Sequence, residues 1–253
     1  DPVPTRIWGT YFKTSNQIYS SQRVKAKNNN VYLAGSSYIV NNIATINAYQ
    51  TNGISEITYG TIQKFDSTGN RLWGTYIGNT PLNRIDYTYN NQISNFEINS
   101  NEEIFIVGST KDEDFNRANN FTTPGAFKEK AKSLEDAEGF IVKFDTQGKR
   151  IWGTYFGGVK MDDIYNISLD KHEDLLICGR TTSDDNIATK GAYIESITRN
   201  SSLAYGFFAN FSKNGNLIYS SYFHVDVNFI TQDNSENIII GGQYLNYNYY
   251  NFL

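Results

Sequence analysis

The sequence predicts an all-β protein, a β-propeller built of four-stranded antiparallel blades in about four repeats. Three observations support this fold class. Strand-like motifs recur in a fixed order along the 253 residues, polar turns with glycine separate them, and aromatic residues reach 15% while charged residues make up only 19%. Tandem four-stranded units are typical of propellers, in which each sheet buries both faces against neighbouring sheets.

A tryptophan motif marks the predicted fourth strand of each repeat. It contains WGTY in three copies and becomes LIYSSYF in the last, and the four copies lie at 6–12, 71–78, 150–158 and 217–223. Alternation along a strand sends Trp and Tyr to opposite faces, so each can pack against a different neighbouring blade. We therefore predict a structural packing role for the first aromatic position of the motif. The residues at that position are Trp8, Trp73, Trp152 and Tyr219.

Two further elements complete the repeat. A turn such as KFDSTGN, with glycine in the penultimate position, precedes the last three copies and predicts a hairpin with a left-handed glycine. Short apolar runs such as VYLAG and IFIVG predict a strand buried on both faces, and weaker alternating stretches such as DIYNISLD predict the strand before it. The glycines that end the apolar runs are Gly35, Gly108, Gly179 and Gly241.

We expect the repeats to form a single domain over residues 1–253. Their approximate bounds are 13–78, 79–158, 159–223 and 224–253, with 6–12 added to the last. In this interpretation the N-terminal strand completes the last blade and closes a four-bladed ring, which removes open sheet edges. The alternative is that the chain is a piece of a larger propeller.

The middle of the chain contains the segments RIWGTYFGG, DDIYNISLD, DLLICGRTTS, TKGAYIES and GFIVKFDTQGK. These segments resemble the bacterial SBBP-type β-propeller repeat family, and the similarity covers nearly the whole chain. The last repeat departs from the family pattern, since His224 stands where Gly-Gly is expected after LIYSSYF. The resemblance implies an exported protein, located at the cell surface, in the periplasm or outside the cell, often in bacteria that use type IX secretion.

Charge and hydropathy argue against two classes of partner. The net charge is −4 and no basic stripe is present, which argues against nucleic acid. No apolar run reaches the roughly 20 residues of a membrane-spanning helix, so we expect no transmembrane segment. Cys178 stands in an apolar run, and His172 and His224 make neither a zinc site nor a triad, so we name no catalytic residue.

Carboxylates near the starts of the predicted first strands are candidate binding groups. They are Asp86, Asp162, Asp163 and Asp226. In a propeller such residues can line the central channel, where carboxylate oxygens can hold Ca²⁺, and Asp162 and Asp163 are the candidate ligands. No other cofactor is expected. The alternative interpretation is that these side chains cap turns by accepting hydrogen bonds from backbone N–H groups.

The C-terminal stretch YLNYNYYNFL is a second candidate surface. Tyrosine rings stack on sugar faces and asparagine amides bond to hydroxyl groups, so Tyr247, Tyr249 and Tyr250 form a candidate glycan platform. The alternative is a strand of the last blade.

These observations favour a non-catalytic binding or scaffold propeller of the bacterial cell envelope or secretome. It would engage an envelope or secreted protein, or a glycan, through its inter-strand loops. The alternative is a polysaccharide-acting propeller enzyme, a glycoside hydrolase or lyase that uses channel-facing carboxylates as general acid and base.

Overall fold

The computed structural model describes residues 22–37, 42–52, 58–78, 91–111, 121–132, 136–197 and 204–243. Within these ranges the chain is all-β, as predicted, and no helix is long and apolar enough to cross a membrane. The first seven strands are β1 (Arg23–Lys27), β2 (Asn30–Ser37), β3 (Tyr59–Phe65), β4 (Arg71–Ile77), β5 (Asn91–Ile98), β6 (Ile104–Thr110) and β7 (Glu138–Phe144). The next seven are β8 (Arg150–Phe156), β9 (Asp162–Leu169), β10 (Leu175–Thr181), β11 (Tyr205–Phe211), β12 (Leu217–Phe223), β13 (Asp226–Gln232) and β14 (Ile238–Gln243).

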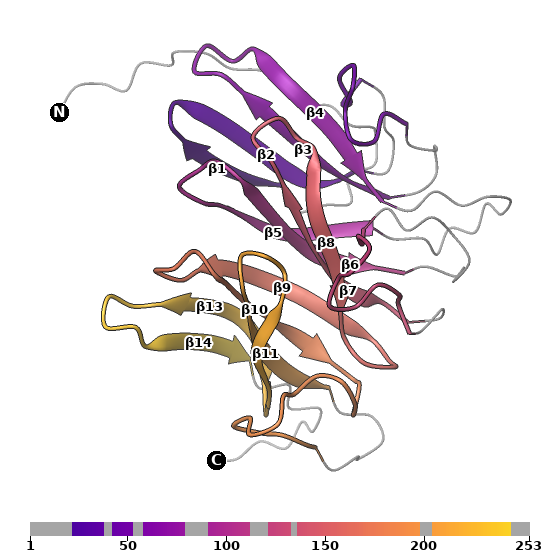
Figure 1. The fold of residues 1–253 in the computed structure, drawn as a ribbon, viewed down its shortest axis with the longest axis vertical. Helices are drawn as coiled ribbons and strands as arrows, with labels where there is room; N and C mark the ends of the chain where they lie inside the picture. Colours follow the sequence, from indigo (N-terminus) through magenta and orange to yellow (C-terminus); the bar gives the residue numbers. More distant parts are fainter. Residues whose placement is uncertain are drawn as a thin grey trace, which may run out of the picture.

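Consecutive strands form antiparallel sheets, which we number one to four along the chain (Figure 1). Sheet one contains β1 to β4, sheet two β5 to β8 and sheet three β9 to β12, and sheet four pairs β13 with β14. The predicted four-stranded antiparallel unit is therefore present in three repeats, and two strands of the fourth repeat are described.

The sheets stack in chain order, because the first strand of each sheet packs on the preceding sheet. β5 packs on β2 and β3, β9 on β6 and β7, and β13 on β10 and β11. Buried apolar side chains fill these junctions. One cluster joins Tyr32 of sheet one to Phe96 of sheet two. Another joins Leu176 of sheet three to Ile230 of sheet four. The first strands β1, β5, β9 and β13 consequently follow one another along the stack.

The tryptophan motif ties neighbouring sheets together. The Trp73 indole Nε1 donates a hydrogen bond to the backbone oxygen of Thr146 in the next sheet, at 3.0 Å. Trp152 repeats this contact with the backbone oxygen of Lys213, at 3.1 Å. Tyr219 differs, because its ring packs on Phe208 and its hydroxyl oxygen accepts a hydrogen bond from a backbone N–H.

The hairpin turns that receive these indoles have the left-handed glycine that the sequence predicts. In the turn of sheet two, the Asp145 carboxylate accepts hydrogen bonds from the backbone N–H groups of Gln147 and Lys149, at 2.8 and 2.9 Å. Gly148 in this turn has φ +74°, a backbone conformation that costs free energy for any residue with a Cβ.

A bulge recurs in the first strand of sheets two, three and four. The extra residues are Ser94, Tyr165 and Asn228. A second-strand glycine lies opposite each bulge, where a Cβ would overlap a first-strand carbonyl oxygen. These glycines are Gly108, Gly179 and Gly242.

In sheet four the glycine opposite the bulge is Gly242, one residue after the Gly241 of the sequence motif. In sheet one, a Cβ on Gly35 would meet the side chain of Gln22.

Sheet one and sheet four lie at opposite ends of the stack (Figure 1), so the described residues form an open stack and not a closed ring. The segment 6–12 that is predicted to close the ring, including Trp8, lies outside the described ranges. Residues 244–253 of the last repeat also lie outside them. Ring closure therefore stays a prediction.

Candidate functional site

The first strands of all four sheets border one pocket of about 300 Å³, which we call the first-strand pocket. Its described lining residues are Arg23, Ser36, Gln92, Ile93, Ser94, Tyr165, Asn166 and Asn228. The set contains hydroxyl and amide groups, one guanidinium and one tyrosine ring, and no carboxylate. The pocket therefore offers hydrogen-bond donors and acceptors with little fixed negative charge.

The repeated bulge builds this pocket. Because a bulge re-aims the side chains beside it, Ser94, Tyr165 and Asn228 reach the same space from three successive sheets. Amide groups connect these strands. Asn95 Nδ2 donates to Asn166 Oδ1 at 3.2 Å, and Asn166 Nδ2 donates to the backbone oxygen of Asn228 at 3.2 Å. These bonds hold the pocket wall in place before any ligand arrives.

A charged cluster adjoins the pocket next to Tyr165. The Arg180 Nε lies 3.9 Å from Asp226 Oδ1, and Asp163 also interacts with this guanidinium. Burial raises the pKa of both Asp163 and Asp226, and the positive charge of Arg180 partly opposes that rise. The pKa of Tyr165 is raised by burial and by the two carboxylates. Asp163 and Asp226 thus share the positive charge of one guanidinium.

Asp162 faces away from this cluster, because neighbouring residues of a strand point to opposite sides. It is 0% exposed and accepts hydrogen bonds from Thr181 Oγ1, from Ser183 Oγ at 3.0 Å and from the Gly158 backbone N–H at 2.7 Å. Burial raises its pKa to about 7, and the nearby Glu138 carboxylate adds to the rise. Asp162 therefore anchors a loop at the junction of sheets two and three, out of reach of a ligand.

Among the sequence-predicted carboxylates, the structure brings Asp163 and Asp226 together and separates Asp162 from both. The described ranges contain no group of three or more His, Cys, Asp or Glu residues that would hold a metal. The calcium proposal for Asp162 and Asp163 stays a prediction, although these two side chains do not converge. Four further candidates lie outside the described residues, namely Asp86, Tyr247, Tyr249 and Tyr250.

Sequence reasoning did not identify Arg180 or the bulge residues. A weak signal was available, because Gln92, Asp163 and Asp226 each stand two positions before a bulge residue. The backbone oxygen of each is the atom nearest to a Cβ placed on the second-strand glycine of the same sheet. Cys178, by contrast, is buried as its apolar context suggests, and burial raises the pKa of its thiol to about 12.

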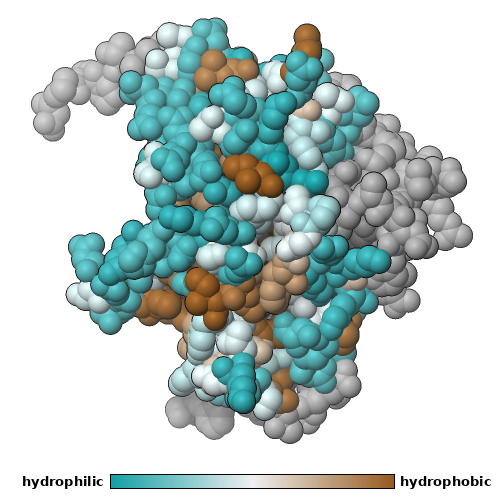
Figure 2. Space-filling model, in the orientation of Figure 1, coloured by the Kyte–Doolittle hydropathy of each residue, from teal (hydrophilic) through white to brown (hydrophobic). Residues whose placement is uncertain are grey.

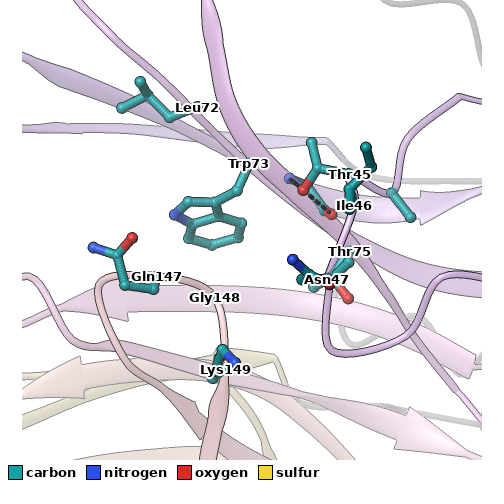
Figure 3. Close-up of a pocket in the computed structure, with 12 residues that line it drawn as sticks. Thr45, Ile46, Asn47, Leu72, Trp73, Thr75, Gln147, Gly148 and Lys149 are labelled. Carbon is teal, nitrogen blue, oxygen red and sulfur yellow. Dashed lines mark hydrogen bonds between the residues drawn. The ribbon is translucent and has the colours of Figure 1, made fainter.

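A second depression of about 640 Å³ surrounds Trp73 between sheets one and two (Figure 3). Figure 3 shows the indole between Leu72 and the loop of Thr45 and Ile46, with Gly148 beneath it. The indole N–H already bonds to Thr146, and Ile46 is 92% exposed. This depression joins only two sheets and its indole is engaged in structural packing, whereas strands of all four sheets line the first-strand pocket, which we take as the candidate site.

No protein-family model matches the chain, and no curated protein matches it.

Proposed function

We propose that this protein is a non-catalytic β-propeller module that binds a glycan in the first-strand pocket. The observation that carries the proposal is the convergence of Ser94, Tyr165 and Asn228, from three different sheets, on one polar pocket. A repeated bulge at the same register position builds a shared site, whereas a purely structural bulge has no need to face the same space in each sheet.

The chemistry of the pocket favours sugar hydroxyl groups. Hydroxyls both donate and accept hydrogen bonds, and the amides of Gln92 and Asn228 and the Ser94 hydroxyl, which line the pocket, supply both functions. The Tyr165 ring provides an apolar face beside them. A volume of about 300 Å³ is at the small end of ligand pockets, which suits one or two sugar rings.

The propeller assignment and the cellular location belong to the same proposal. The stack of antiparallel sheets supports blades, and the SBBP-type resemblance supports export to the cell surface, the periplasm or the medium of a bacterium. The loops between the strands would contact an envelope or secreted protein as a partner. The cellular location is inferred from the family resemblance alone, and the class of ligand is inferred from the residues that line the pocket.

A polysaccharide-cleaving enzyme is the competing proposal. It needs two carboxylates that reach substrate, one protonated and one ionised. Asp162 is completely buried, so Asp163 and Asp226 are the remaining described pair, and both are engaged with Arg180. No described geometry favours this alternative over binding.

A glycan array with the 253-residue chain, followed by calorimetric titration of the best-bound oligosaccharide, tests the proposal. We expect Asn228→Ala and Tyr165→Ala to weaken binding by about tenfold or more, which corresponds to about 1.4 kcal/mol. Tyr193→Ala is the matched control, because Tyr193 is an exposed tyrosine outside the pocket. Unchanged affinity in both pocket variants, or no bound glycan, would refute the proposal. Release of new reducing ends, lost in Asp163→Asn, would support the enzyme instead.

A further inference from the structure

Three basic side chains lie on one face of β1, because residues two apart in a strand point to the same side. They are Arg23, Lys25 and Lys27. The Lys25 ammonium lies 2.6 Å from the Glu97 carboxylate of sheet two, and Lys27 interacts electrostatically with Glu173 of sheet three. Arg23 lines the first-strand pocket, and no residue within the described ranges pairs with its guanidinium. The basic side chain at the pocket is therefore the one without a counter-charge.

Arginine at this position distinguishes sheet one from the next two sheets. The equivalent first-strand residue pairs with the residue before the second-strand glycine, and it is Asn95 in sheet two and Asn166 in sheet three. Those two asparagines join neighbouring strands through their amides. Arg23 adds a full positive charge and several N–H donors to a pocket whose other described lining residues are neutral. Packing of the repeat does not require this charge.

The charged cluster beside Tyr165 gives the pocket a direction. Asp163 and Asp226 share the positive charge of Arg180. Among the described residues, no carboxylate lies within ion-pair distance of Arg23, so this cluster does not supply its partner. The pocket is thus positive where sheet one borders it, and negative charge lies near its border with sheets three and four.

The surface around the sheets has a related polarity. Figure 2 shows mostly hydrophilic side chains over sheets one and two, and hydrophobic side chains gathered over the region of β13 and β14. A ligand with a charged group at one end and less polar ring faces at the other matches this arrangement, with its charged end towards sheet one.

We propose that the first-strand pocket selects an acidic sugar, in which the carboxylate of a uronic acid pairs with Arg23. This selection rests on the proposed glycan binding and narrows it to one class of sugar. A guanidinium and a planar carboxylate form two parallel hydrogen bonds, which fix the orientation of the sugar as well as adding affinity. The Gln92 amide and the Ser94 hydroxyl remain for the ring hydroxyls, and the Tyr165 ring for an apolar sugar face.

A neutral sugar in the same place would be bound less tightly. If it displaced water from the Arg23 guanidinium without supplying an acceptor of opposite charge, the loss of hydration would cost free energy. A carboxylate offsets that cost through its charge and its hydrogen bonds. Arg23 is exposed, so salt should screen part of this gain.

Calorimetric titration with matched disaccharides tests the proposal. The probes are disaccharides of galacturonic, glucuronic and mannuronic acid, each compared with the neutral disaccharide of the same linkage and stereochemistry, in which a hydroxymethyl group replaces the carboxylate. We expect the acidic member of the best-bound pair to bind about tenfold or more tightly than its neutral counterpart. This preference should shrink as NaCl is raised from about 20 to about 500 mM.

Arg23→Gln separates the charge from the shape of the pocket. It keeps an amide donor but removes the charge, so we expect the acidic disaccharide to lose about tenfold in affinity and the neutral one to be unchanged. Arg23→Lys keeps the charge without the planar fork and should retain part of the preference. Lys27→Gln is the matched control, because it removes a positive charge from the same face of β1 outside the pocket.

Different results distinguish this selection from glycan binding itself. Equal affinity for the acidic and neutral members would overturn the selection and leave the proposed function intact, whereas no binding to any member or to the glycan array would overturn both. Equal losses in Arg23→Gln and Lys27→Gln would contradict a direct contact with Arg23. Sodium acetate should not displace the acidic disaccharide at equal concentration, and displacement would mean that the site takes small anions instead. An unchanged acidic preference in Arg23→Gln, with a lower melting temperature, would make Arg23 a structural counter-ion.

Discussion

The indole nitrogen of Trp73 and the backbone oxygen of Thr146 lie 3.0 Å apart and join the fourth strand of sheet one to a hairpin turn of sheet two. The ring also covers Gly148 of the same turn, where a Cβ would lie 2.7 Å from the indole. The Trp-Gly-Thr-Tyr repeat is therefore a tie between successive sheets, and its partner is the glycine turn of the next repeat.

Gly148→Ala should destabilise the protein through this tie. The new methyl group must displace the Trp73 ring, in addition to the strain of φ +74°. Gly125→Ala is the matched control, since Gly125 has φ +79° and no atom within 4 Å of the added Cβ. We expect Gly148→Ala to lower the free energy of unfolding by about 1–3 kcal/mol more than Gly125→Ala, measured by urea denaturation. Equal losses would show that the indole contact contributes nothing.

Gly179→Ala should be more damaging than Gly241→Ala. A Cβ on Gly179 overlaps the backbone oxygen of Asp163 across the bulge, whereas the nearest atom to a Cβ on Gly241 lies 3.6 Å away. We expect a loss of about 2–4 kcal/mol for Gly179→Ala and less than about 1 kcal/mol for Gly241→Ala. Thermal unfolding followed by circular dichroism measures both, and similar melting temperatures for the two variants would contradict the bulge geometry.

Asp162 should make the protein less stable as the pH rises. Its pKa is raised from 3.8 to about 7 by burial, so the folded state binds a proton more tightly than the unfolded state. The stability from this group is complete below pH 3.8 and is lost as the pH rises through about 7. Asp162→Asn, a mimic of the protonated form, should flatten this part of the stability profile obtained by denaturant titration.

Asp66→Asn is a control, because we expect Asp66 to change the stability with pH in the opposite direction to Asp162. Hydrogen bonds from Thr68 and Asn70 lower the pKa of the exposed Asp66 to about 2. Its contribution is therefore present above its ordinary pKa of 3.8 and is lost as the pH falls through about 2. If Asp66→Asn and Asp162→Asn changed the profile in the same direction, the assigned role of Asp162 burial would be wrong.

Glu102→Gln should weaken the junction between sheets one and two. The Glu102 carboxylate accepts hydrogen bonds from Tyr32 Oη and Lys64 Nζ, both at 2.7 Å, and these bonds lower its pKa from 4.5 to about 2. We expect a loss of about 1–3 kcal/mol near neutral pH, diminishing as the pH falls from 4.5 towards about 2.

Glu236→Gln provides the comparison at the equivalent position of sheet four. Glu236 pairs with Lys171 at an exposed site, where water screens the two charges, so we expect a smaller loss than for Glu102→Gln. Guanidinium denaturation of both variants near neutral pH measures the difference. A larger loss for Glu236→Gln than for Glu102→Gln would contradict the role assigned to partial burial of the ion pair.

The sequence by itself determined the strands, their antiparallel hairpins and the order of the repeat. These features are local, because alternation along five to eight residues and a left-handed glycine in a turn act between neighbours in the chain. The tryptophan repeat was equally visible, and its structural role follows from strand alternation. The partner of each tryptophan was not visible, since Trp73 and Thr146 are separated by 73 residues.

Tertiary structure decided which polar side chains meet. Asp162 and Asp163 are adjacent in sequence, which makes both of them candidate calcium ligands, yet alternation places one in a buried junction and the other beside Arg180. The bulge at Tyr165 then shifts the register by one residue and brings amide and hydroxyl groups from three sheets to one pocket. A one-residue shift moves a side chain to the other face of a sheet, so the site depends on long-range packing that no local pattern records.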